Sequence, residues 1–334
     1  MKRKALKNAG NSALVLSRTR KELLDRVFTD YYELEGKTIF KEKELRFIFE
    51  TLKDNLRMKS ITFMKFIDFL RNTGYITDVK RISVDNSSRK LYFSKFFDPN
   101  SSFRNSLELA KTLYDNGYIS HYTAAYLHGL TEQIPKTIYV RVEYPTYSDN
   151  DGEVKLTQER IDIAFSKPYK IPTKFSVKNF LGFRIKKIFT KKSQKVGVSK
   201  ISIDDKSNLE VKITSIERTL IDIAVRPEYS GGISEVCKIY RNAVKMGVVN
   251  IHKVVNLIKR LNFVYPYHQT IGFLLELSGA DSAELNYIRE NFPIRYNFYL
   301  IHGMNKIDQE DQEDIVFVRD WKIYVPKSVL GERI

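Results

Sequence analysis

Residues 60–93 read SITFMKFIDFLRNTGYITDVKRISVDNSSRKLYF. The first part predicts a helix with Ser60 at its N-cap and Gly74 at its end, because serine caps helices well and glycine often ends them. The residues at helical spacing that would face inward are Phe63, Met64, Phe66, Ile67 and Leu70. Two strand-like runs follow at 75–84 and 89–93, and the turn-forming residues between them are typical of a hairpin. The stretch therefore predicts a helix and then a β-hairpin.

Two more helices are expected ahead of this stretch. Residues 19–32 carry apolar side chains on one helical face, and residues 41–52 repeat an apolar residue at i, i+3, i+4 and i+7. A short strand over 38–40 would separate them. Three helices followed by a hairpin is the order of a winged helix-turn-helix, so we predict such a domain over residues 1–100.

A winged helix-turn-helix would bind DNA through two of these elements. The second helix of the pair enters the major groove, and the hairpin meets phosphates or the minor groove. The candidate DNA contacts are Lys59, Ser60, Thr62, Lys65 and Arg71 in and before the helix, and Lys80, Arg81, Arg89 and Lys90 in the hairpin. Winged helices also bind proteins, so an interaction adaptor is an alternative function.

The distribution of charge favours a polyanionic partner. The net charge is +16, and residues 1–200 hold the whole excess, since residues 201–334 contain 17 basic and 18 acidic residues. Between Asp162 and Asp204 lie 41 residues with no acid and 11 Lys or Arg. A solvated face usually mixes both signs, and no basic amphipathic helix suited to a membrane surface is found there, so nucleic acid is favoured. The second basic surface expected from this segment consists of Lys178, Arg184, Lys186, Lys187, Lys191, Lys192 and Lys195, and it could face DNA or RNA.

The composition predicts a globular cytoplasmic protein. Hydrophobic residues make up 43% of the chain, which is enough for packed cores. The single cysteine, Cys237, excludes an intrachain disulfide and is expected to be a small core residue of a helix. No apolar run reaches the ~7–15 residues of a signal peptide or the ~20 of a bilayer span.

Residues 101–334 are expected to form a larger, mixed α/β second domain. The boundary falls at residues 98–102, where Asp, Pro, Asn and Ser cluster. A helix over 103–116 would open the domain, and the pattern is largely helical from 214 to 290. Strands are expected at 137–143, 160–164, 184–190, 208–213, 296–301 and 321–325, with an acidic loop at 308–314 between the last two. The expected fold class of the whole chain is α+β.

One conspicuous box in this domain is GYISHYTAAYLHGLTEQIP at residues 117–135. Ser120 would cap a short helix that Gly129 ends. His121 and His128 are seven residues apart, but no Cys, Asp or Glu stands at a spacing that would complete a metal site. We therefore expect structural histidines and no metal.

A second box is TSIERTLIDIAVRPEYSGG at residues 214–232. Thr214 and Glu217 have the spacing of a capping box, and Arg218 and Asp222 can pair at i, i+4. Each feature has a structural explanation, so the box predicts a well-capped helix and not an active site.

The two boxes, in this order behind a winged helix, resemble the AbiEi family of antitoxins from abortive-infection phage-defence operons. The resemblance covers nearly the whole chain. It implies that the first domain binds inverted repeats in the promoter of its own operon and represses transcription. It also implies that the second domain counteracts a nucleotidyltransferase-like toxin in a type IV toxin–antitoxin system, where no stable complex is required. The resemblance assigns no residue to antitoxin activity.

A DNA-binding, metal-dependent nuclease is the enzymatic alternative. Asp204 or Asp205, followed by Glu210 and Lys212, has the residue types that hold Mg²⁺ and orient water in such enzymes. However, the two aspartates fit a turn, and Glu-x-Lys is common on exposed strands. No phosphate-binding glycine loop, nucleotidyltransferase motif, serine nucleophile elbow or zinc pattern is found. We therefore expect a protein without catalytic activity and without a cofactor.

Overall fold

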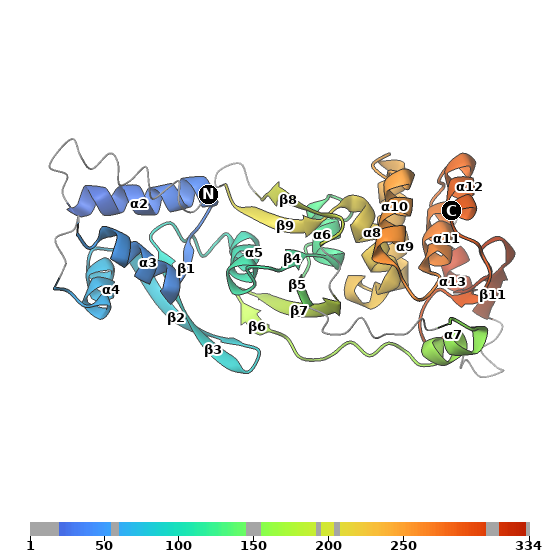
Figure 1. Cartoon of the computed structure of the whole chain (residues 1–334), viewed down its shortest axis with the longest axis horizontal. Helices are drawn as coiled ribbons and strands as arrows, with labels where there is room; N and C mark the ends of the chain where they lie inside the picture. The colour runs from blue at the N-terminus through green and yellow to red at the C-terminus, as the bar shows by residue number, and fades with distance from the viewer. Residues whose placement is uncertain are drawn as a thin grey trace.

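The computed structural model describes residues 20–54, 60–144, 155–191, 195–203, 208–304 and 314–331. These residues form an α+β structure in which three sheets follow one another along an elongated molecule (Figure 1). None of the helices in the described ranges is long and apolar enough to cross a membrane.

In the described residues of the N-terminal part there are three helices and a small sheet. The helices are α2 (Arg20–Glu35), α3 (Glu42–Leu52) and α4 (Phe63–Asn72), and the strands are β1 (Ile39–Lys41), β2 (Ile76–Val84) and β3 (Ser87–Ser94). The sheet has the order β1-β3-β2, with both pairs antiparallel. The expected apolar faces of the helices form one buried cluster, which includes Phe28, Ile48 and Phe66. The predicted order of three helices and a hairpin is confirmed.

Two details of α4 differ from the expectation. The helix begins after Thr62, whose hydroxyl accepts a hydrogen bond from the Lys65 N–H at 3.4 Å, so Ser60 is not its cap. Met64 was expected inside but is 57% exposed. From a helix start at Phe63, position 64 is rotated about 100° away from the buried stripe at 63, 66, 67 and 70.

The central sheet has the strand order β6-β7-β5-β4-β9-β8. Its strands are β4 (Tyr118–Ile119), β5 (Thr137–Tyr144), β6 (Val177–Phe180), β7 (Phe183–Lys191), β8 (Val198–Ser202) and β9 (Glu210–Thr214). The pairs β5–β7 and β4–β9 are parallel, and the other pairs are antiparallel. Helix α5 (Ser102–Leu113) packs on β5, β7 and β9, whereas α6 (His121–Leu127) packs on β5 and on α8 (Ile216–Val225).

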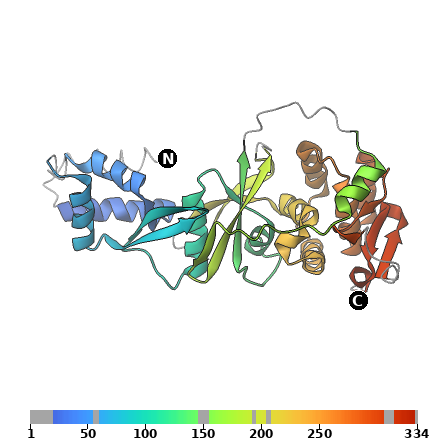
Figure 2. The same ribbon diagram turned by 90° about the horizontal axis from the view of Figure 1, so that it is seen from below.

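The N-terminal part and the central sheet share a hydrophobic core. The inner face of the hairpin, which includes Ile82, Val84 and Leu91, belongs to the same buried cluster as Leu109 of α5 and Ile185 of β7. Buried packing therefore continues across residues 98–102, where the sequence predicted a domain boundary. Figure 2 shows the hairpin running from the helices toward the central sheet.

A buried carboxylate also joins these two parts. Glu108 of α5 accepts hydrogen bonds from the Thr38 N–H at 2.5 Å and the Ile39 N–H at 2.7 Å, just where β1 begins. Its other oxygen accepts from the Thr38 hydroxyl and from Arg104.

A glycine is required at position 36, since its φ is +61° and an added Cβ would lie 2.4 Å from the backbone nitrogen of Leu209.

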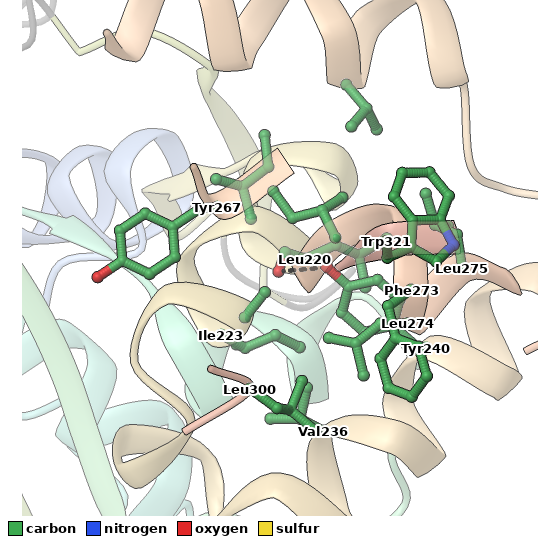
Figure 3. Packing of buried hydrophobic residues seen from close by; sticks show 14 of the residues in the cluster. Leu220, Ile223, Val236, Tyr240, Tyr267, Phe273, Leu274, Leu275, Leu300 and Trp321 are labelled. Carbon is green, nitrogen blue, oxygen red and sulfur yellow. Dashed lines mark hydrogen bonds between the residues drawn. The ribbon is translucent and has the colours of Figure 1, made fainter. Parts of the chain in front are cut away.

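The C-terminal part is mainly helical, as expected. It contains α9 (Ile233–Lys245), α10 (Ile251–Leu261), α11 (Tyr267–Leu277), α12 (Ser282–Asn291) and α13 (Lys327–Leu330), with the short 3-10 helices η2 (Pro227–Ser230) and η5 (Arg319–Trp321). Its core surrounds Tyr240, whose hydroxyl donates to the carbonyl of Leu220 at 2.9 Å (Figure 3). Cys237 is buried in α9, which confirms its expected structural position.

The predicted strands near the C-terminus are only partly confirmed. A small sheet has the order β10-β12-β11, with β10 (Phe298–Tyr299), β11 (Ile315–Val318) and β12 (Ile323–Pro326). Strand β10 is shorter than expected, and β11 was not predicted. The acidic loop at 308–314 lies almost entirely outside the described residues.

The strand predicted at 160–164 is wrong, because these residues lie in helix α7 (Gln158–Phe165). Thr157 caps the helix, and Ile161 and Phe165, one helical turn apart, are buried. Figure 1 shows α7 beside β11 and the C-terminal helices, away from the central sheet. Gln158 holds it there, since its side-chain oxygen accepts from the Asn297 N–H at 2.9 Å. The short apolar pattern at residues 160–164 fits both a strand and a helix, and contacts with a distant segment favour the helix.

Candidate nucleic-acid interface

Helix α4 presents a polar face to solvent. Its buried side packs through Phe63 and Phe66 against Phe49 of α3, with ring centroids 6.1 Å and 5.0 Å apart. This packing leaves Thr62, Lys65, Asp68, Arg71 and Asn72 exposed, as the sequence predicted, and Ser60 is exposed just before the helix. Lys59 lies outside the described residues.

The two basic side chains of this face are available to a partner. Within the described ranges, neither Lys65 nor Arg71 forms an ion pair. In the neighbouring helix α3, by contrast, Arg46 pairs with Glu42 at 2.7 Å. Exposed cations on a helix, with amide and hydroxyl groups beside them, are suited to contacts with phosphates and base edges.

The hairpin adds basic residues in a specific register. Arg81 of β2 stands directly opposite Lys90 of β3. Like charges at opposite positions of an antiparallel pair are destabilising, and an anionic group between them would relieve the repulsion. Lys80 is exposed as well, but it pairs with Asp78 at 3.1 Å.

A groove of about 610 Å³ lies between the hairpin and strand β6. Lys80 and Arg81 line one side, and Lys178 lines the other. The groove therefore brings together two basic segments for which the sequence predicts separate surfaces.

The tip of the hairpin is anchored on the central sheet through Asp85, whereas Asn86, Ser87 and Ser88 beside it are exposed. Asp85 has a φ of +55° in the turn, and its N–H donates to the Ser176 carbonyl at 2.9 Å. Its carboxylate accepts from the Ser176 hydroxyl at 3.1 Å and from the Lys187 ammonium at 2.7 Å. Burial alone would raise the pKa of Asp85, but these two hydrogen bonds outweigh it, and the pKa is lowered. Arg89 is also engaged, because it donates to the Leu113 carbonyl at 3.2 Å.

The second basic stretch is not a single surface. Alternation along β7 sends Arg184 and Lys186 to one side of the sheet and Lys187 to the other. Lys186 is only 3% exposed and donates to the Pro172 carbonyl, whereas Lys187 is held by Asp85. Lys178 and Arg184 remain exposed, and Lys195 is half-buried. The side chain of Lys191 is not described, and Lys192 lies outside the described residues.

The second sequence box contributes a buried carboxylate to the interior. Asp222 of α8 accepts hydrogen bonds from Arg141 of β5 at 2.7 Å and from Arg218 at 2.9 Å. Burial alone would raise the pKa of Asp222, but the two guanidinium groups lower it to about 2. Sequence reasoning found the Arg218–Asp222 pair but missed Arg141. The available signal was a charged residue in the otherwise apolar strand core TIYVRV.

The two histidines of the first box have structural surroundings. His121 is fully buried, its Nδ1 lies 2.9 Å from the Ser120 hydroxyl, and burial lowers its pKa to about 3. His128 contacts the Thr214 carbonyl through Nε2 at 2.6 Å and so links the first box to the second. No group of three or more His, Cys, Asp or Glu suited to a metal ion occurs in the parts of the chain that the structure describes.

The capping box predicted for α8 is wrong. Ser215, not Thr214, is the N-cap, and its hydroxyl accepts from the Arg218 N–H at 3.3 Å. Thr214 is the last residue of β9, and its buried hydroxyl lies 2.7 Å from that of Thr219. Glu217 is buried instead of reaching back to the helix start.

The residues of the nuclease alternative are only partly described. Glu210 pairs with Lys200 at 2.8 Å on the exposed edge of the sheet, and Lys212 donates to the Asp115 carbonyl at 3.2 Å. Asp204 and Asp205 lie outside the described residues.

Comparison of the chain with protein-family models and with curated proteins finds no match. The resemblance to the AbiEi family therefore depends on the two boxes and on the order of the N-terminal elements.

Proposed function

We propose that the chain binds double-stranded DNA through α4 and the β2–β3 hairpin. The observation that carries this proposal is the exposed face of α4, where Lys65 and Arg71 form no ion pair with a described residue. This helix packs against β2 of the hairpin. The phosphate backbone of DNA bound at α4 would continue along the groove between the hairpin and β6. Lys178 would then contribute to affinity without reading sequence.

The N-terminal elements support a winged helix-turn-helix as the DNA-binding unit. Helices α3 and α4 would be the helix-turn-helix pair, with α4 as the recognition helix. Strand β1 pairs with β3, so a three-stranded sheet stands behind the helices and the hairpin forms the wing. The anchored tip distinguishes this wing from one that inserts into DNA by its turn. We infer that its sides, at Arg81 and Lys90, make the phosphate contacts.

We further propose that the protein represses its own operon and acts as an antitoxin against a nucleotidyltransferase-like toxin. The resemblance of the two boxes to the AbiEi family supports this part. The His128–Thr214 contact between the boxes and the Arg141–Asp222 ion pair give these segments a structural role in joining the central sheet to the C-terminal helices. These contacts do not indicate which residue would act on a toxin.

The DNA-binding proposal is tested by measuring the affinity of the full chain for duplexes carrying the region upstream of its own gene. The full chain is needed, because the hairpin shares its core with the central sheet. We expect specific binding that weakens steeply as salt rises, since several phosphates are neutralised. Equal affinity for unrelated duplexes would exclude the repressor function. Growth rescue on co-expression with the adjacent toxin gene tests the antitoxin function separately.

A further inference from the structure

A cleft of about 210 Å³ lies beside the central sheet, apart from the proposed DNA-binding surfaces. The end of α5 and the following turn form one wall, and β4, β5, β8 and β9 form the rest. Its floor is apolar, with Ile119, Val140 and Val211. Gly117 packs closely against this floor, because an added Cβ would lie 2.7 Å from Val140.

Among the described residues, two carboxylates line this cleft, and both are already paired. Asp115 binds Lys41 at 2.6 Å, and Glu210 binds Lys200 at 2.8 Å. Lys41 and Lys200 therefore neutralise these two carboxylates, and neither carboxylate forms an ion pair with Lys111 or Lys212, the other lysines of the cleft.

The ammonium groups of Lys111 and Lys212, by contrast, have no carboxylate partner among the described residues. Over the described ranges, Lys111 forms neither an ion pair nor a hydrogen bond through its ammonium group, and Lys212 donates only to the Asp115 carbonyl. Burial lowers the pKa of both lysines. Lys37 lowers the pKa of Lys111 further, whereas Glu108, Glu35 and Glu210 raise it, and the net direction is down. Lys111 is exposed and Lys212 is half-buried. Two such cations beside an apolar floor form a site that attracts an anion with an apolar body.

We propose that this cleft binds a small organic anion, whose carboxylate or phosphate is held by Lys111 and Lys212 while its apolar part lies on Ile119, Val140 and Val211. The size of the cleft limits the ligand. A cavity of about 150 Å³ accepts benzene, so this cleft has room for one ring and one anionic group. The site gives a role to Lys212, which the DNA-binding surfaces do not use.

The test uses phenyl phosphate and benzoate as probes, added to the full chain with labelled Ile and Val methyl groups. We expect the methyl signals of Ile119, Val140 and Val211 to shift with a Kd of about 1 mM or tighter for at least one probe, and Ile271 in the C-terminal core to stay unchanged. Inorganic phosphate and benzyl alcohol, which carry the charge or the ring alone, should bind at least about 10-fold more weakly.

The variant with both Lys111→Gln and Lys212→Gln should bind the same probes about 10-fold or more weakly, while Lys245→Gln, an exposed lysine of α9, should bind them as the wild type does. Unshifted methyl groups with both probes, or equal affinity of the double variant, would overturn the proposal. Benzyl alcohol binding as tightly as the anions would overturn the role of the lysines. A methyl spectrum of the unliganded double variant that matches the wild type shows that the fold is kept.

Discussion

Asp85, at the tip of the β2–β3 hairpin, binds Lys187 of β7 through a 2.7 Å ion pair, although the two residues are 102 positions apart. This contact fixes the hairpin on the central sheet. It also removes Lys187 from the surface available to nucleic acid, and it places Lys80 and Arg81 across a groove from Lys178. The pair therefore determines which basic residues face a DNA backbone and which stabilise the fold.

Removal of this ion pair should lower stability in a pH-dependent way. Asp85→Asn keeps a residue that tolerates the positive φ but loses the charge, and we expect the free energy of unfolding to fall by about 1 kcal/mol at neutral pH. The pKa of Asp85 is lowered from its ordinary value of 3.8, so the pair stabilises the fold fully above that pH and less as pH falls through the lowered pKa. The difference between wild type and variant in urea unfolding should thus shrink below about pH 3.8. A difference that is constant with pH would mean that the charge of Asp85 does not stabilise the fold.

Substitution on the exposed face of α4 should weaken DNA binding. Lys65→Gln and Arg71→Gln each remove a cation that has no ion pair within the described chain, and each should reduce affinity by about 1–3 kcal/mol if the side chain contacts a base edge. The measurement is fluorescence anisotropy with the upstream duplex and an unrelated duplex. Lys245→Gln on the distant helix α9 is the matched control and should leave the affinity unchanged. If both α4 variants bind as the wild type does, α4 is not the recognition helix.

Substitution in the groove should weaken DNA binding without changing the preference for one sequence. Lys178→Gln removes a phosphate contact, so binding should weaken by a similar factor on specific and unrelated duplexes. The slope of log affinity against log salt should become shallower by about 1. An unchanged salt slope would mean that DNA does not follow the groove between the hairpin and β6.

Substitution of the buried carboxylate should destabilise the protein without a direct effect on DNA contacts. Asp222→Asn leaves Arg141 and Arg218 buried without a counter-ion, and we expect a loss of about 3–5 kcal/mol in the free energy of unfolding. The exposed Glu159→Gln in α7 is the control and should change stability by less than about 0.5 kcal/mol. Because the pKa of Asp222 is about 2, the stabilisation should persist from neutral pH down to about 3.8 and then decline toward pH 2. Equal unfolding midpoints of wild type and Asp222→Asn would show that the network adds no stability.

Much of the N-terminal architecture could be predicted from the sequence. The apolar residues of α2, α3 and α4 recur at helical spacing, and a turn-forming segment separates the two strands of the hairpin. These patterns are local, so each one reports which side of a single element is buried. The outward positions of α4, including Lys65 and Arg71, follow from the same rule.

Helix α7 shows the limit of such local patterns. The short run RIDIA fits a strand as well as a helix, and the choice depends on contacts with residues 296–303, more than 130 positions away. The basic stretch shows the same limit for surface residues. Its lysines were predicted to lie together, but alternation along β7 and the approach of the hairpin bury Lys186 and pair Lys187.

The sequence by itself determined the helices and hairpin of the N-terminal part, the fold class and the excess of positive charge over the first 200 residues. These features depend on composition and on spacing within one element. Only the tertiary structure decided that Asp85 binds Lys187, that Arg141 joins Arg218 at Asp222, and that Lys178 faces Lys80 and Arg81. Each of these relationships joins elements far apart in the chain. Its geometry depends on how apolar faces pack, and no local spacing encodes that packing.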